Sequence, residues 1–138
     1  MTAPNTTAVA TATTAEAREE LAKFFTLAAL VEQPPEMFSR FIDEEWHRLA
    51  ETAEYGAFCE RTAGAPVRHD TTRGEGVVSW VDGYHARFGD LPAVWFADES
   101  GKVDAPAYNT YQATRIVRAS WNCSADPGGD GDFTAPTN

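Results

Sequence analysis

The sequence predicts a mostly helical α+β domain, in which about four helices precede a small antiparallel hairpin or meander. Up to about residue 88, apolar residues recur every three or four positions, which is the period of amphipathic helices. Proline and glycine separate these periodic stretches from one another. After Pro92 the period changes, because a short apolar run at 93–97 is followed by turn residues at 98–101.

The first two helices are predicted at 15–31 and 35–50. Thr13 and Glu16 have the spacing of a capping box, with Thr13 as the N-cap. The first helix has one apolar stripe, which consists of Leu21, Phe24, Phe25, Ala28 and Val31. Pro34 and Pro35 precede the second helix, as is common at helix starts. Its apolar stripe consists of Phe38, Phe41, Ile42 and Leu49, with Trp46 on the flank.

Two shorter helices are predicted at 53–62 and 77–88, with a loop at 67–76 between them. Thr52 can cap the third helix, whose apolar face consists of Tyr55, Phe58 and Cys59. The segment 67–76 is rich in Arg, His, Asp, Thr and Gly, a composition typical of loops. The fourth helix ends at Gly89, and its apolar stripe consists of Val77, Val81, Tyr84 and Phe88.

The strands are predicted after Pro92. The apolar runs at 93–97 and 116–121, with Val103 between them, are the candidates for a small antiparallel sheet. Three of the tryptophans fit core or rim positions better than a ligand-binding aromatic box, because tryptophan is strongly buried on average. These are Trp80, Trp95 and Trp121.

Composition predicts one globular domain at 13–123, with tails at 1–12 and 124–138 that contain too little apolar surface to offset the entropy of ordering them. The net charge of −10 disfavours nucleic acid as a partner, because an acidic surface repels phosphates. No apolar run approaches the roughly 18 residues of a membrane span, and a signal-peptide pattern is missing. We therefore expect a cytoplasmic protein without membrane or nucleic-acid partners, in which Cys59 and Cys123 are free thiols. The oligomeric state stays open.

The second predicted helix carries an unusual group of titratable residues. Asp43 and His47 are one helical turn apart, so we expect a hydrogen bond between their side chains, and both point away from the apolar stripe. Glu45 lies within that stripe, between Phe41 and Leu49, where an unpaired carboxylate is costly to bury. We expect Glu45 to have a partner, a raised pKa or both, unless a small turn of the helix exposes it.

Three short motifs follow one another along this part of the chain: Asp43-x-x-Trp46-His47, Tyr55-x-x-Phe58-Cys59 and then His69. A second segment contains Tyr84-x-x-x-Phe88-Gly89, then Pro92 and Trp95. Over about residues 38–96 these motifs resemble bacterial members of the glycine-rich-domain-protein-like family. This chain departs from the family pattern at Glu44 and Glu45, where the family usually has apolar residues. The resemblance implies that His69 lies on the same side of the molecule as His47.

Four residues form the candidate set of metal ligands: Asp43, His47, Cys59 and His69. Carboxylate, imidazole and thiolate groups all bind zinc-like divalent ions, and residues four apart on a helix can converge on one ion. His85 and Cys123 are candidate additions from the second half of the chain. The alternative is that His47 only pairs with Asp43, while Cys59 packs as a small apolar group.

A metal-free site could use the same residues. His47, oriented by Asp43, would act as a general base, with Glu45 as an acid and His69 beside them. Cys59 is a poor candidate for a nucleophile, because the nearby carboxylates disfavour a thiolate. We expect a small enzyme that performs acid/base or metal-assisted chemistry on a small molecule or peptide. The alternative is a non-catalytic module that binds a peptide or protein in an apolar groove without convergent polar groups.

Overall fold

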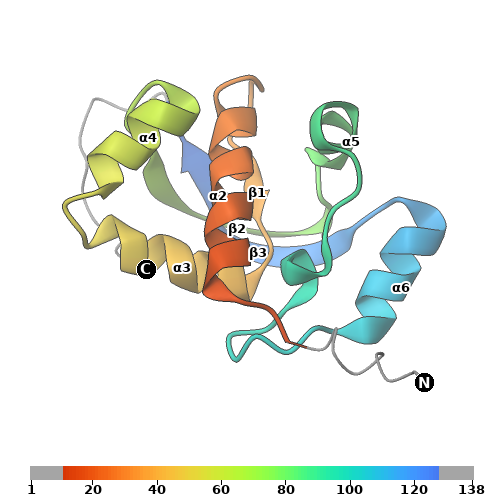
Figure 1. Cartoon of the computed structure of the whole chain (residues 1–138). Coiled ribbons are helices and arrows are strands. Elements are labelled where there is room, and N and C mark those ends of the chain that lie inside the picture. The colour runs from red at the N-terminus through yellow and green to blue at the C-terminus, as the bar shows by residue number, and fades with distance from the viewer. Residues whose placement is uncertain (1–10, 128–138) are drawn as a thin grey trace.

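The computed structural model describes residues 11–127, and in that range it contains five α-helices, one 3-10 helix and three β-strands. In chain order these are α2 (Thr14–Ala28), β1 (Glu36–Met37), α3 (Arg40–Ala50), α4 (Tyr55–Ala63), β2 (Arg68–Val77), α5 (Val81–Phe88), η1 (Ala93–Phe96), α6 (Ala105–Thr114) and β3 (Arg118–Asp126) (Figure 1). The strands form one antiparallel sheet, so the predicted, mostly helical α+β class is confirmed. Within the described range, every helix is too short or too polar to cross a membrane.

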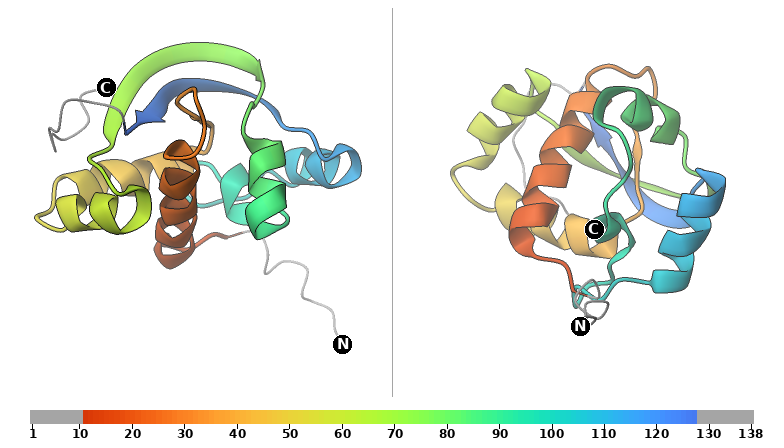
Figure 2. Two further views of the ribbon diagram at one scale, coloured as in Figure 1. Left: turned by 90° about the horizontal axis from the view of Figure 1, so that it is seen from above. Right: turned by 45° about the vertical axis from the view of Figure 1, so that its right-hand side comes forward.

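The sheet has the strand order β1–β3–β2, with β3 in the middle. The short strand β1 pairs with β3 at Met37 and Cys123, whereas β2 pairs with β3 along most of its length. The β2–β3 ribbon is strongly curved, and the helices lie on its concave side (Figure 2). A register shift between Thr71 and Gly74 contributes to this curvature, because a β-bulge bends its strand and increases the local twist.

Helix α2 occupies the centre of the helical layer and contacts α3, α4, η1 and β3 (Figure 1). Its predicted capping box is present, since Thr13 and Glu16 each accept a hydrogen bond from the other's backbone N–H. Phe24 and Phe25 pack edge-on against Trp46 and thereby join α2 to α3. Each such fully buried side chain stabilises the fold by about 1.5–3 kcal/mol.

Glu20 places a carboxylate within this apolar layer, where three donors satisfy it. Its oxygens accept hydrogen bonds from Tyr84 Oη at 2.5 Å, Trp95 Nε1 at 2.9 Å and Lys23 Nζ at 3.0 Å. These bonds offset the cost of burying the charge and connect α2 to α5 and η1. Burial, together with the bond to Glu20, raises the pKa of Tyr84 well above its ordinary value.

Helix boundaries differ from the predicted ones where a strand or a cap intervenes. Helix α2 ends at Ala28 rather than at residue 31, and Val31 is exposed. The second predicted helix begins at Arg40 rather than at residue 35, because residues 36–37 pair with β3 and the Ser39 hydroxyl caps α3. The fourth predicted helix begins at Val81 rather than at residue 77, because residue 77 still belongs to β2.

Two segments have a different secondary structure from the predicted one. The loop predicted at 67–76 is wrong, because Arg68–Val77 is strand β2, whose mostly polar, exposed side chains hide it from pattern analysis. The strand predicted at 93–97 is also wrong, since Ala93–Phe96 forms a 3-10 helix. Helix α6 at Ala105–Thr114 escaped prediction because it buries only Tyr111, and the last strand runs over 118–126 rather than 116–121.

The folded part extends beyond the predicted domain limits at both ends. Thr11 forms a β-bridge with Lys102, and Ala12 is buried. At the other end, Ser124 and Ala125 are buried in β3, so the C-terminal limit at residue 123 is corrected to at least 126. The rest of the predicted tails, 1–10 and 128–138, lies outside the described residues.

The three tryptophans occupy the predicted core and rim positions. Trp80 and Trp95 are buried, and Trp121 is partly buried against the core. The Trp121 indole packs directly over the backbone of Gly74 at the bulge. A Cβ atom added at Gly74 would come within 2.9 Å of this ring, so the close approach requires glycine.

Candidate functional site

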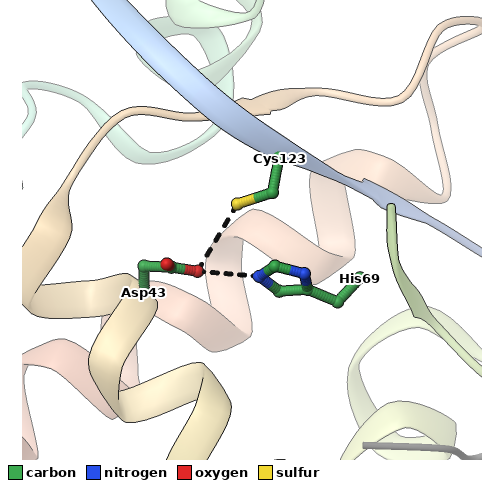
Figure 3. A group of neighbouring side chains, drawn as sticks. All are labelled: Asp43, His69 and Cys123. Atoms are coloured by element: carbon green, nitrogen blue, oxygen red, sulfur yellow. Dashed lines mark hydrogen bonds and ion pairs between the residues drawn. The ribbon is translucent and has the colours of Figure 1, made fainter. Parts of the chain in front are cut away.

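Three side chains from three different elements meet between helix α3 and the sheet: Asp43 of α3, His69 of β2 and Cys123 of β3 (Figure 3). Their carboxylate oxygen, imidazole nitrogen and sulfur atoms all lie within 4.8 Å of one another. His69 Nε2 is 2.9 Å from Asp43 Oδ1, and Cys123 Sγ donates to the same oxygen at 3.5 Å. We refer to these three residues as the Asp–His–Cys cluster.

The sheet register explains why His69 and Cys123 are neighbours. His69 is opposite Ala125, and Thr71 is opposite Cys123, so positions 69 and 123 are diagonal partners on adjacent strands. Because side chains alternate along a strand, both of these residues project from the same face of the ribbon. Asp43 reaches this face from α3, as Figure 3 shows.

His47 lies at the edge of the cluster. Its Nε2 atom is 3.5 Å from Asp43 Oδ2, and its ring centroid is 4.6 Å from that of His69. The predicted Asp43–His47 hydrogen bond is therefore replaced by a longer contact, since good N–H···O bonds span about 2.7–3.2 Å. The short bond of Asp43 goes to His69 instead. The expectation that His69 lies on the same side as His47 is confirmed.

Burial differs across the site. The His69 side chain is only 1% exposed, and its ring packs edge-on against Trp46 with centroids 4.3 Å apart. Asp43 and His47 are 26% and 29% exposed, so solvent reaches the cluster from their side. His69 Nδ1 is buried without a hydrogen-bond partner in the described part of the chain. In the neutral ring the proton therefore belongs on Nε2, where Asp43 accepts it.

The Cys123 thiol is buried, and burial together with the Asp43 carboxylate raises its pKa far above the ordinary value. Without a cation the thiol is therefore protonated at neutral pH and donates to Asp43. The ion pairs of Asp43 within residues 11–127 involve the imidazoles of His47 and His69, and neither lysine nor arginine. The three ligand atoms of the cluster therefore lie close together without an ion pair between Asp43 and a lysine or arginine of the described range.

Glu45 has the partners that the sequence analysis predicted, but it does not join the cluster. Its side chain is 2% exposed and faces the guanidinium groups of Arg18 and Arg48. Arg18 donates to Oε2 through Nε at 2.8 Å, and Arg48 donates to Oε1 through Nη2 at 2.8 Å. Because Arg18 belongs to α2, these contacts connect α2 to α3. Glu45 therefore stabilises the packing of these two helices and does not contact His47.

Cys59 also lies outside the cluster. It is fully buried on α4 near Tyr55 and Val67, and burial raises the pKa of its thiol. The neighbouring Tyr55 hydroxyl accepts from Trp46 Nε1 at 3.0 Å and donates to the Val67 carbonyl at 2.6 Å. The structure thus places Cys123, and not Cys59, beside Asp43 and His69.

The two candidate additions to the ligand set have different outcomes. His85 contacts the Tyr111 hydroxyl at 2.7 Å, between α5 and α6, and not the cluster. Cys123, by contrast, lies within the cluster although it is 80 positions from Asp43 in the sequence. Only the pairing of β2 with β3 brings it there, and that pairing left no pattern in the sequence of β2.

A small pocket of about 80 Å³ opens beside the cluster. Asp43 and Cys123 contribute to its wall, together with the polar residues Ser39, Ser120 and Asn122. This volume accommodates an ion with its waters or a small polar group, but no drug-sized molecule. The cluster is therefore accessible to small polar species.

Comparisons of the chain with protein-family models, with characterised proteins and with solved structures find no match. The similarity to the glycine-rich-domain-protein-like family consequently stays a prediction from the motifs around Asp43, Tyr55 and His69.

Proposed function

We propose that the Asp–His–Cys cluster binds a zinc-like divalent ion, and that the protein is a small enzyme that uses this site for metal-assisted chemistry on a small molecule. The observation that carries the proposal is the convergence of three different ligand types, within 4.8 Å, from three separate elements of the fold.

The chemistry of the ligand atoms supports zinc in particular. Zinc accepts carboxylate oxygen, imidazole nitrogen and thiolate sulfur at bond lengths of about 2.0–2.3 Å. Tetrahedral geometry at these lengths requires ligand atoms roughly 3.3–3.8 Å apart. The 2.9 Å and 3.5 Å separations from Asp43 Oδ1 to His69 and Cys123 are close to that spacing. The third separation, between His69 and Cys123, is at most 4.8 Å, so these side chains would move closer together around an ion.

The charge balance of the site points in the same direction. A buried thiol beside a carboxylate is unfavourable to ionise, but a dication reverses this preference and stabilises the thiolate. Asp43 would then share the ion with His69 and Cys123 instead of receiving their protons. His47, 3.5 Å from Asp43 Oδ2, is placed either to complete the ligand set or to move protons at its edge.

Three protein ligands with a solvent-exposed side are typical of catalytic rather than structural zinc sites. The partial exposure of Asp43 and His47, and the polar pocket beside them, provide such an open side. The ion would supply Lewis-acid activation, while His47 would serve as the acid/base group. Glu45, held by two arginines, is assigned a structural role in this proposal.

A non-catalytic binding module is the second candidate, and one observation favours it. The structure contains a groove of about 530 Å³ with mainly aromatic and aliphatic walls, which is the feature expected of such a module. The groove adjoins the polar pocket rather than replacing it, because Phe38 and Arg40 line both. The same groove can therefore belong to an enzyme.

The proposal is tested by measuring zinc affinity on the full chain, purified without a histidine tag and stripped of metal, in competition with a chromophoric chelator. We expect one zinc per chain, and a loss of affinity of more than about tenfold in His69→Gln. His85→Gln is the control, because His85 is a partly buried histidine that contacts Tyr111 instead of the cluster. Equal zinc affinity in both variants, or no binding by the unmodified protein, would refute the metal site.

A further inference from the structure

The groove of about 530 Å³ lies between η1, α6 and the start of β3, and it is the larger of the two cavities that meet at Phe38. Its apolar wall consists of Phe38, Trp95, Phe96, Tyr111, Ile116 and Val117. This volume lies within the roughly 300–1,000 Å³ of small-molecule sites, which are usually lined by aromatic and aliphatic side chains with few polar groups. Ile116 is about half exposed, although an isoleucine is normally buried.

The charged residues of the groove differ in how far their hydrogen-bonding capacity is already used. Asp98 Oδ1 accepts from the backbone N–H groups of Ser100 and Lys102, and Asp104 caps α6 by accepting from Ala107 N. Both carboxylates therefore accept hydrogen bonds from backbone N–H groups of neighbouring residues.

The two arginines of the groove remain available to a ligand. Arg40 pairs with Glu99 at 3.2 Å, but both side chains are largely exposed, so this pair contributes little. Arg118 is exposed, and no ion pair is found for it among the described residues. A guanidinium group binds carboxylates through two parallel hydrogen bonds. The groove thus combines an apolar body with two arginines, whereas its two aspartates, Asp98 and Asp104, are engaged by backbone N–H groups.

We propose that this groove binds a small organic carboxylate with an aromatic or branched aliphatic body. Its carboxylate group is held by Arg40 and Arg118, and its body packs against Phe96 and Ile116. Arg40 is one helical turn from Asp43 and also lines the polar pocket, so this ligand lies next to the Asp–His–Cys cluster. That such a carboxylate is the substrate rests on the proposed function, whereas its binding does not.

The test is a titration of the isotopically labelled full chain with 2-naphthoate, followed by amide chemical shifts, with 2-naphthylmethanol as the neutral analogue. We expect shifts centred on α6, η1 and residues 116–119. The acid should bind at least tenfold more tightly than the alcohol. In the double variant Arg40→Gln/Arg118→Gln this preference should disappear, while Arg73→Gln, an exposed arginine on β2 outside the groove, should retain it.

A second variant tests the location without removing charge. Ala107→Trp on α6 fills the groove and should abolish binding of both compounds, and the dispersion of its amide spectrum reports whether it is folded. Shifts centred elsewhere, or equal binding of acid and alcohol, would overturn the proposal. Cys123→Ser and metal-stripped protein should still bind 2-naphthoate. If the unmodified protein binds naphthoate but no zinc, the metal site alone is contradicted. If the unmodified protein binds zinc but no naphthoate, the groove alone is contradicted.

Discussion

Asp43 shows at the level of single residues how one side chain can organise a site. Its two carboxylate oxygens contact two histidines and one cysteine from the sheet and from its own helix. The helical spacing of Asp43 and His47 was sufficient to predict that they are neighbours. Cys123 was named as a candidate addition, but its place beside Asp43 could not be predicted, because only the register between β2 and β3 brings it within reach.

For Glu45, helical spacing predicted the buried position correctly but did not decide between a catalytic and a structural role. The sequence predicted a carboxylate within an apolar stripe that needs a partner, and Arg18 and Arg48 are those partners. The partner Arg18 could not be predicted, because it depends on how α2 packs against α3. Burial with two arginines explains the residue without catalysis.

We predict that Glu45→Gln lowers the free energy of unfolding by about 1–3 kcal/mol, because it removes charge-assisted hydrogen bonds at a buried position. Urea unfolding followed by tryptophan fluorescence measures this change. Glu44→Gln is the control, since Glu44 is adjacent but exposed, and it should shift the free energy by less than about 0.5 kcal/mol. Equal stability of the two variants would contradict the structural role of Glu45.

At the level of elements, the sequence predicted helices better than strands. Helices α2, α3, α4 and α5 each bury a periodic apolar stripe, and this period is visible in the sequence. Strand β2 has no such signal, because its side chains point largely to solvent and its backbone pairs on one side with β3. Its glycines and charged residues are typical of loops, and this segment forms a strand because its backbone is hydrogen-bonded to β3.

The bulge of β2 provides a test of the sheet geometry. We predict that Gly74→Ala destabilises the protein by about 1–3 kcal/mol, because the added Cβ would lie within 2.9 Å of the Trp121 ring and force it to move. Gly83→Ala on α5 is the control, since its Cβ would contact only Leu27 at 3.9 Å and alanine favours helices. The melting temperatures of both variants measure this difference in stability. An unchanged melting temperature for Gly74→Ala would disprove the close packing.

At the level of the whole molecule, the curved ribbon and the helical layer enclose one core around α2 (Figure 2). The fold class followed from composition and period, but the sheet topology did not. Two of the three strands lie in segments predicted as a loop or as the start of a helix. The site is formed where strand β2, which was predicted as a loop, meets the predicted helix α3. The sequence-based description of the site was incomplete for the same reason.

Buried tyrosine and cysteine side chains make the stability of the molecule depend on alkaline pH. Burial raises the pKa of Cys59 and of Tyr55 above their ordinary values of about 8.5 and 10. Below these ordinary values both the folded and the unfolded chain hold the proton, so the free energy of unfolding does not depend on these groups. Above them the unfolded chain releases protons that the folded chain retains, so we predict that stability falls by up to about 1.4 kcal/mol per pH unit for each group.

Urea midpoints between pH 7 and 10.5 measure this dependence. The Cys59→Ala variant should show a smaller fall in stability above about pH 8.5, because only the Cys123 thiol is then left to ionise in the unfolded state. Midpoints that are constant over this range would show that these groups are not buried as described.

The central claim, that Cys123 and not Cys59 is a metal ligand, is tested most directly by the absorption spectrum of the full chain with one equivalent of Co²⁺. Cobalt adopts zinc-like geometry and shows a charge-transfer band in the near ultraviolet when a thiolate binds it. We predict this band in the unmodified protein and in Cys59→Ser, and its loss in Cys123→Ser, with near-ultraviolet circular dichroism confirming that both variants are folded. A band that persists in Cys123→Ser, or that is missing from the unmodified protein, would contradict the account.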